Sequence, residues 1–243
     1  MPSHGKAYRA ARAQIDREQL YSPVEALRLL KGAETAKFDE SVEAHFNLGL
    51  NVRHAEEQLR GTLMLPHGTG RETRVAVFAD GDKAREAEEA GADVVGTNDL
   101  ATKIEEGFDE FDVAVATPDQ MSVVGKLGRI LGPRGKMPNP KAGTVTFDVG
   151  KAVRDAKAGK LEYRTDRGAN VHLPLGKRSF SERQLLENYA TILEEIMRAR
   201  PAAAKGRYIR TITLASSMGP GIKIDPAKTR GIVEEMEEAV AAA

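Results

Sequence analysis

The middle of the chain alternates between short apolar runs and polar helical segments, and this alternation constrains the fold more than any other feature. The apolar runs are RVAVFAD (74–80), ADVVG (92–96) and FDVAVATP (111–118). Helical segments follow at 81–91, 98–107, 120–132 and 147–160. Such alternation is typical of parallel strands covered by helices. The middle therefore predicts a three-layer, Rossmann-like α/β domain.

The two ends of the chain contain helices of a different kind, each introduced by a capping signal. Ser22 is followed by proline and, three positions after the cap, by Glu25, which is a capping box. Ser179 and Glu182 repeat this arrangement at the start of segment 179–200, whose apolar residues keep helical spacing. We expect each helix to bury one face.

Segments that resemble strands also lie at both ends, which indicates one α+β domain built from the two terminal halves. Apolar and polar residues alternate in parts of 40–52, 160–176 and 207–219. The α/β middle is then an insertion, and glycine-containing segments mark its two crossing points. The predicted domains are an α+β domain of residues 1–66 plus 160–243 and an inserted α/β domain of residues 67–159.

Charge is segregated along the chain, although the formal net charge is zero. Residues 82–119 carry 12 acidic and three basic side chains, whereas residues 121–178 carry 13 basic and four acidic ones. This asymmetry favours a polyanionic partner for part of the chain. The alternative is a set of solvated faces. The segment 226–243 is acidic at its end, and the spacing of its apolar residues indicates an amphipathic helix.

The chain has none of the features of a membrane or secreted protein. No apolar run approaches the roughly 18 residues of a membrane span, and the first 20 residues lack the apolar core of a signal peptide. The absence of cysteine excludes disulfides and thiolate metal sites. We expect a cytoplasmic protein with no membrane partner.

A nucleotide-binding α/β enzyme is the alternative function, but the glycine-rich segments do not support it. HGTGRE (67–72) precedes its strand, whereas a dinucleotide loop follows one. In GPRGKMP (132–138), Lys136 is followed by Met137 instead of the Ser or Thr of a phosphate loop. No two of the five histidines have the spacing of a helical metal site. We therefore expect no catalysis, no cofactor and no metal.

Three segments combine the residue types that bind RNA. KFDES (37–41) places a cation, an aromatic ring and a hydroxyl together, and YRTDRGANVH (163–172) offers two arginines beside Tyr163. Aromatic and arginine planes stack on bases, while hydroxyls and backbone amides bind ribose and phosphate. SSMGPG (216–221) is glycine-rich, so another backbone can approach it closely. Alternatively, Phe38 and Tyr163 are core residues and 216–221 is only a turn.

The chain resembles the bacterial L-one family of ribosomal proteins, which forms the mobile side stalk of the large subunit. The resemblance covers His4 to about Asp225, and its most specific block is LGRILGPRGKMPNPKAGTV (127–145). Supporting blocks are KFDESVEAH, LPHGTGR, EEAGADVVG and SSMGPG. The family implies two domains and a protein that is monomeric when free. It also implies binding of large-subunit ribosomal RNA near the exit site for tRNA, assistance in tRNA release, and repression of the protein's own messenger RNA.

The resemblance also implies which residues bind RNA, and it places them in the terminal-halves domain. These are Lys37, Phe38, Glu40, Ser41, Arg164, Asp166, Arg167, His172, Ser217, Met218, Gly219 and Pro220. Two departures from the family pattern occur. Ser217 stands where threonine is common, and the middle of DRGANVH (166–172) differs from the usual motif.

The basic segment 129–145 contains three prolines and three glycines, which predicts an irregular loop of the inserted domain. Arg134, Lys136 and Lys141 are candidates for a secondary contact with ribosomal RNA phosphates or a passing tRNA. The alternative is that the prolines only stiffen this loop.

Overall fold

The computed structural model describes residues 5–33 and 36–227, and the chain divides into two compact units. Unit 1 comprises residues 1–71 and 163–243, and unit 2 comprises residues 72–162. The helix predicted in the acidic tail falls on residues 228–243, outside the described ranges. Within those ranges, no helix has the length and apolar character needed to cross a bilayer.

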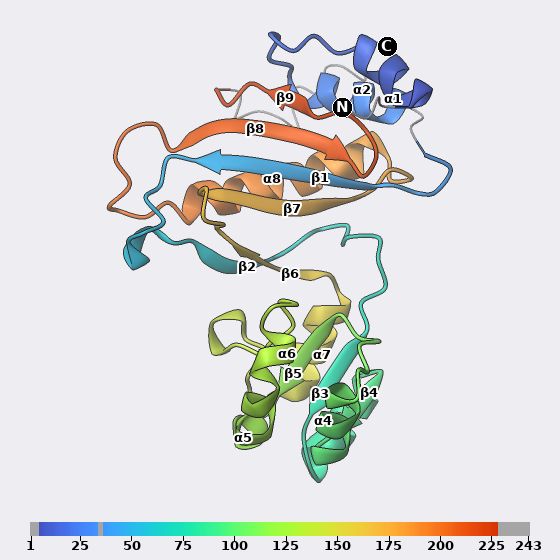
Figure 1. The fold of residues 1–243 in the computed structure, drawn as a ribbon, viewed down its shortest axis with the longest axis vertical. Coiled ribbons are helices and arrows are strands. Elements are labelled where there is room, and N and C mark those ends of the chain that lie inside the picture. The colour runs from blue at the N-terminus through green and yellow to red at the C-terminus, as the bar shows by residue number, and fades with distance from the viewer. Residues whose placement is uncertain (1–4, 34–35, 228–243) are drawn as a thin grey trace. The chain divides into compact units, whose positions relative to one another are not determined.

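Unit 1 is built on a four-stranded antiparallel sheet of order β7-β1-β8-β9 (Figure 1). The sheet joins distant parts of the chain: β1 (Ser41–Leu48) pairs with β8 (Ile209–Ser216). The outer strands are β7 (Asn170–Lys177) and β9 (Ile222–Ile224). Both halves of the chain are therefore needed to complete this sheet.

Two amphipathic helices, α2 (Pro23–Gly32) and α8 (Glu182–Arg198), pack on the sheet of unit 1 and on each other. Residues of β1 alternate as the period of a strand requires. Phe46 and its apolar neighbours in β1 are fully buried, and Phe46 stacks on Tyr189 of α8 with ring centroids 6.3 Å apart. Glu43, His45 and Asn47 lie on the opposite, polar face. One face of the sheet is thus core, and the other is open.

Four shorter elements complete the regular structure described around the main sheet of unit 1. The helix α1 (Lys6–Ala13) precedes α2, and the 3-10 turn η1 (Ala55–Glu57) follows β1. A two-stranded sheet joins β2 (Arg60–Met64) to β6 (Lys160–Arg164), and residues 160–162 of β6 are assigned to unit 2.

Unit 2 has a three-stranded parallel sheet of order β4-β3-β5, which confirms the parallel pairing predicted from the alternation. Its strands are β3 (Val75–Phe78), β4 (Val94–Gly96) and β5 (Val113–Ala116). Its helices are α3 (Asp82–Glu89), α4 (Asn98–Glu105), α5 (Met121–Val124), α6 (Gly128–Leu131) and α7 (Val149–Lys157), with 3-10 turns η2 (Pro118–Gln120), η3 (Gly125–Leu127) and η4 (Pro140–Ala142).

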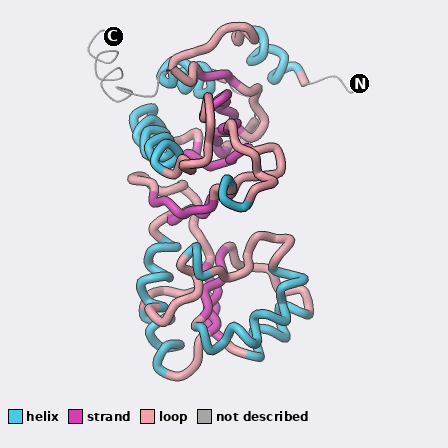
Figure 2. Tube along the Cα trace, turned by 90° about the vertical axis from the view of Figure 1, so that its left-hand side faces the viewer, coloured by secondary structure: helices cyan, strands magenta, loops and turns pink. Residues whose placement is uncertain are grey.

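The strands of unit 2 lie between two sets of helices (Figure 2). Ala76 and Phe78 point to a core shared with α4, α5 and α6. Val75 and Val77 point to a second core shared with α3 and α7. The central strand β3 is therefore buried on both faces, as is typical of parallel sheets.

Some predicted elements differ in detail from the structure. The capping box at Ser22 is confirmed, whereas the one predicted at Ser179 is wrong, because Ser181 and Gln184 cap α8 instead. The single helix predicted over 120–132 is broken into α5 and α6 by a 3-10 turn that contains Gly125. The strand predicted over 160–176 is two strands separated by a turn at 166–169.

Candidate nucleic-acid interface

The start of β1 and the end of β8 lie side by side, so two of the three predicted RNA-binding segments meet. Val42, the residue after the first segment, pairs with Ser216, the first residue of the second. The backbone N–H of Ser41 donates to Ser217 Oγ at 3.1 Å, and the N–H of Ser217 donates to the carbonyl of Ser41 at 3.1 Å. Residues that are 176 positions apart in sequence therefore form one local structure.

Two large apolar side chains stand out from this junction. The exposed fraction is 58% for Phe38 and 57% for Met218, which places them among the most exposed large apolar residues of the described chain. Neither is part of the core, so the core alternative stated for Phe38 is wrong. An exposed aromatic ring and an exposed thioether are suited to the stacking of unpaired bases.

The loop that carries Phe38 is held in place by contacts to the segment before α8. The carboxylate of Asp39 accepts hydrogen bonds from the backbone N–H and the hydroxyl of Ser179, at 3.0 and 2.7 Å. Glu40 is fully buried, with a carboxylate oxygen 4.0 Å from the Arg178 guanidinium. Lys37, by contrast, is exposed. The buried Glu40 therefore anchors the loop to the protein, while Lys37 and Phe38 are exposed to solvent.

The turn 216–221 is tightly packed at Gly219. The N–H of Gly219 donates to the carbonyl of Ser216 at 3.1 Å. A Cβ atom on Gly219 would lie 2.4 Å from Ser216 Oγ, so the Ser216 side chain would have to move to admit it. Pro220 is buried, so it supports the turn from inside. The turn therefore presents Ser217 and Met218 on a fixed backbone.

The third predicted segment lies at the other end of β1. The N–H of Leu48 donates to the carbonyl of Ala169 at 2.9 Å, and Asn47 pairs with Asn170. Asn47 is six residues from Ser41, which at about 3.3 Å per residue is roughly 20 Å along the strand. Arg164, Asp166 and Arg167 therefore do not join Ser41 and Met218 in one compact site.

Within this third segment, two predicted contributors are engaged by the protein itself. Asp166 accepts from the N–H groups of Gly168 and Asn170 at 2.8 and 2.7 Å, and the Asn170 side chain also donates to it. These bonds hold the pKa of the Asp166 carboxyl below its usual range, with the Asn170 amide the first cause. Tyr163 is buried and donates to Glu195 at 3.0 Å, so it is a core residue. Arg164 and Arg167 are exposed.

His172 lies between the two ends, opposite His45 on the open face of the sheet. The Nδ1 atoms of the two rings are 2.9 Å apart. Burial, followed by the charge of His172, lowers the pKa of His45, while Glu43 acts in the opposite direction. This pair cannot readily carry two protons.

Two cations of the basic loop 129–145 form ion pairs with an acidic residue of unit 2. Lys136 Nζ donates to Asp109 Oδ1 at 2.6 Å and lies 4.9 Å from the centre of the Phe111 ring. Arg134 pairs with the same carboxylate at 3.1 Å. The Lys136 side chain keeps only 17% of its surface exposed, so stiffening of the loop accounts for this residue better than an RNA contact. Lys141 is exposed.

The supporting residues Asp39, Lys177 and Arg178 were missed by sequence reasoning. Lys177 Nζ donates to Ser41 Oγ at 3.0 Å, across 136 positions of sequence. The only signal for these contacts is the pairing of β1 with β7, which sequence pattern alone does not establish. Nothing in the described residues forms a group of three or more histidine or carboxylate side chains that could hold a metal.

Comparison with known proteins gives a consistent family assignment. The model of the ribosomal protein L1p/L10e family matches residues 29–220. A protein of Rubrobacter xylanophilus named large ribosomal subunit protein uL1 is 61% identical over 227 residues, which cover 93% of this chain and 99% of the relative. A protein of Frankia alni with the same name is 56% identical over 230 residues, covering 95% and 97%.

Proposed function

The chain belongs to the ribosomal protein L1p/L10e family and is a structural protein of the large ribosomal subunit, and on that premise we propose that unit 1 binds large-subunit ribosomal RNA at the side stalk. Family membership does not favour the alternative of a nucleotide-binding enzyme. A mononucleotide titration by calorimetry tests that alternative directly, and we expect no heat of binding.

The observation that supports this proposal most is the junction of β1 and β8. Phe38 and Met218 are exposed, and in sequence each lies within three residues of the hydrogen-bonded pair Ser41 and Ser217. In this proposal the two side chains stack on unpaired bases, and Ser217 and nearby backbone groups bind ribose or phosphate. Because the net charge of the chain is zero, shape and stacking carry more of the affinity than charge.

The test compares two phenylalanines of equal exposure. Phe38→Ala removes the proposed stacking ring, and Phe147→Ala removes a ring of unit 2 that is 57% exposed. We expect Phe38→Ala to weaken binding of a side-stalk ribosomal RNA transcript by about 1–3 kcal/mol, as for the loss of one stacked base. Phe147→Ala should have little effect. Equal losses in the two variants would remove the support for the proposed site.

The family resemblance suggests two finer functions for the same surfaces. In this proposal the interface of unit 1 also binds a similar fold in the protein's own messenger RNA and thereby represses its translation. Tethered near the exit site, unit 2 assists the release of deacylated tRNA, and the exposed cations Arg129 and Lys141 are its candidate contacts. Competition between the ribosomal RNA transcript and the messenger leader for the protein tests the first of these functions.

A further inference from the structure

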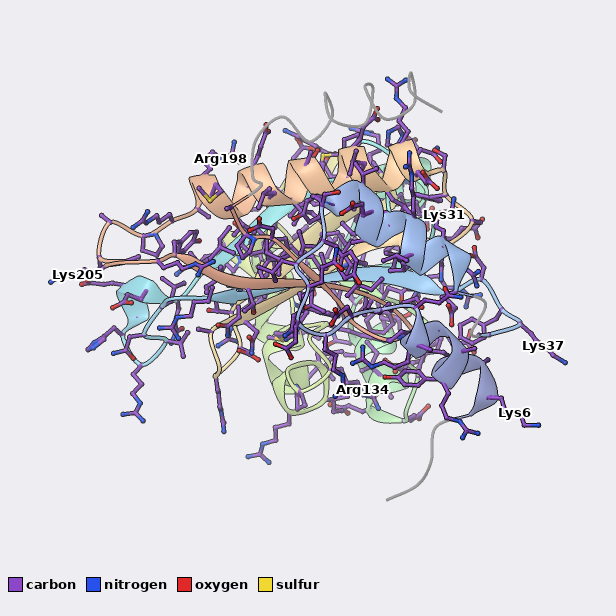
Figure 3. The ribbon with its side chains drawn as sticks, turned by 90° about the horizontal axis from the view of Figure 1, so that it is seen from above. Lys6, Lys31, Lys37, Arg134, Arg198 and Lys205 are labelled. Atoms are coloured by element: carbon purple, nitrogen blue, oxygen red, sulfur yellow. The ribbon has the colours of Figure 1, made fainter. Side chains whose placement is uncertain are left out.

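The helix α1 has a composition that its packing does not explain. Its eight residues, KAYRAARA, carry Lys6, Arg9 and Arg12 and no acid. Only Ala11 of this helix is buried. In the part of the chain that the structure describes, none of the three cations forms an ion pair. Lys6 points away from the ribbon, as does Lys37 (Figure 3).

A cavity connects this helix to the turn that carries Met218. Its volume is about 270 Å³, and its lining includes Arg12 and Arg17 from the N-terminal segment and Pro220, Gly221 and Lys223 from the C-terminal one. Pro220 and Gly221 belong to the same turn as Met218, so the cavity continues the proposed interface. A water occupies about 30 Å³ of liquid, so this cavity is large enough for a sugar–phosphate unit.

The charge of the cavity favours an anion in spite of two acids in its wall. Asp16 and Glu18 also line it. The Asp16 carboxylate is engaged locally, because it accepts the N–H of Glu18 at 3.0 Å. Lys223 Nζ donates to the carbonyl of Arg17 at 3.1 Å, which keeps its charge at the rim. The cavity lining therefore contains three cations and two acids, which gives it a net positive charge. Lys6 and Arg9 of α1 add two further cations to this part of the surface.

We propose that α1, together with Arg17 and Lys223, forms a phosphate-binding extension of the RNA interface. This inference rests on the proposed function, and it assigns to α1 a role that differs from that of Phe38 and Met218. The arginines bind backbone phosphates of the RNA segment next to the one stacked on the turn. Phosphate contacts fix position and register and carry no sequence information directly.

The experiment measures dissociation constants at several salt concentrations for the side-stalk transcript and for an unrelated hairpin of equal length. The variants are Arg9→Ala, Arg12→Ala and the double substitution, with Arg85→Ala of α3 as an exposed control. Each lost contact should reduce the magnitude of the log–log salt slope by about 0.7–0.9 and weaken binding at 0.1 M salt by roughly five- to tenfold. The loss should be similar for both RNAs. Replacement of either arginine by lysine should restore the slope.

An unchanged slope in the double variant overturns the role of α1. So does a loss that lysine fails to restore, because charge would then not be the cause. Phe38→Ala separates this failure from that of the proposed function. If Phe38→Ala weakens specific binding while the double variant does not, only the α1 extension is wrong. If neither weakens it, both proposals fail. Thermal melts of each variant establish that unit 1 remains folded.

Discussion

Lys136 shows that a cation in a basic loop can serve the fold instead of a partner. Its ammonium group donates to the backbone carbonyls of Asp109 and Phe111 as well as to the exposed Asp109 carboxylate. If the loop separated from the rest of unit 2, water would have to replace the hydrogen bonds that Lys136 makes to Asp109 and Phe111. The sequence shows that the segment is basic. It does not show the groups that accept hydrogen bonds from Lys136, because Phe111 and Asp109 are 25 and 27 positions away and meet the lysine only in the folded domain.

We expect Lys136→Ala to destabilise unit 2 and to leave RNA affinity nearly unchanged. The loss of hydrogen bonds from a largely covered ammonium group to backbone carbonyls should cost about 1–2 kcal/mol in the free energy of unfolding. Lys141→Ala, at an exposed position of the same loop, is the matched control and should leave stability unchanged. Chemical denaturation of both variants measures the difference. A selective loss of RNA binding in Lys136→Ala would show that the lysine is part of the interface after all.

The histidine pair makes stability depend on pH in a defined direction. Folding lowers the pKa of His45 from its ordinary value of 6.5, so the unfolded chain binds more protons near that pH. The stabilisation is fully present above about pH 6.5 and is lost as the pH falls through the lower pKa of the folded state. We expect His45→Gln to flatten this part of the stability–pH curve, measured by urea denaturation from pH 8 to pH 5. A curve identical to that of the unmodified protein would contradict the assignment.

At the scale of elements, local patterns predicted the existence of helices and strands better than their ends. The motif SFSERQ contains two serines, each followed three positions later by Glu or Gln. Sequence alone favoured Ser179, but Asp39 binds the hydroxyl of that serine from 140 positions away. Ser181 is then the cap, with Gln184 as its partner. The choice between two equivalent local signals was made by a tertiary contact.

This assignment separates the roles of the two serines. Ser181→Ala removes a cap and should lower the free energy of unfolding by about 1 kcal/mol. Ser179→Ala removes a hydrogen bond to Asp39 and should loosen the loop that carries Phe38. We therefore expect Ser179→Ala to weaken RNA binding more than Ser181→Ala does, while Ser181→Ala lowers the melting temperature more. Melting curves and RNA titrations of both variants test this, and a reversed order would show that Ser179 caps the helix.

The sequence predicted which segments form the candidate site, but it did not predict how those segments are arranged in space. Composition marked the three polar, glycine- or arginine-containing segments, and strand pairing then placed two of them together and the third about 20 Å away along β1. Burial separated Phe38, which is exposed, from Tyr163 and Glu40, which are not. Exposure depends on what covers a side chain, and the contacts of Glu40 and Tyr163 with Arg178 and Glu195 come from residues far along the chain.

At the scale of the whole molecule, each unit has its own main sheet and its own core. All four strands of the β7-β1-β8-β9 sheet and both covering helices belong to residues 1–71 and 163–243. The parallel sheet and its two cores belong to residues 72–162. The hydrophobic burial that stabilises one unit is therefore largely independent of the other.

We expect unit 1 to fold and bind RNA without unit 2. The test chain joins residues 1–71 to 160–243 through a short glycine–serine linker, so that β6 is retained whole for pairing with β2. Its salt-dependent affinity for the side-stalk transcript should stay within about tenfold of that of the full chain, because the cations lost with unit 2 contribute at most a few phosphate contacts. Phe38→Ala in this shortened chain should cause the same loss as in the full chain. A shortened chain that melts cooperatively yet binds both RNAs equally weakly would move the specific site to unit 2.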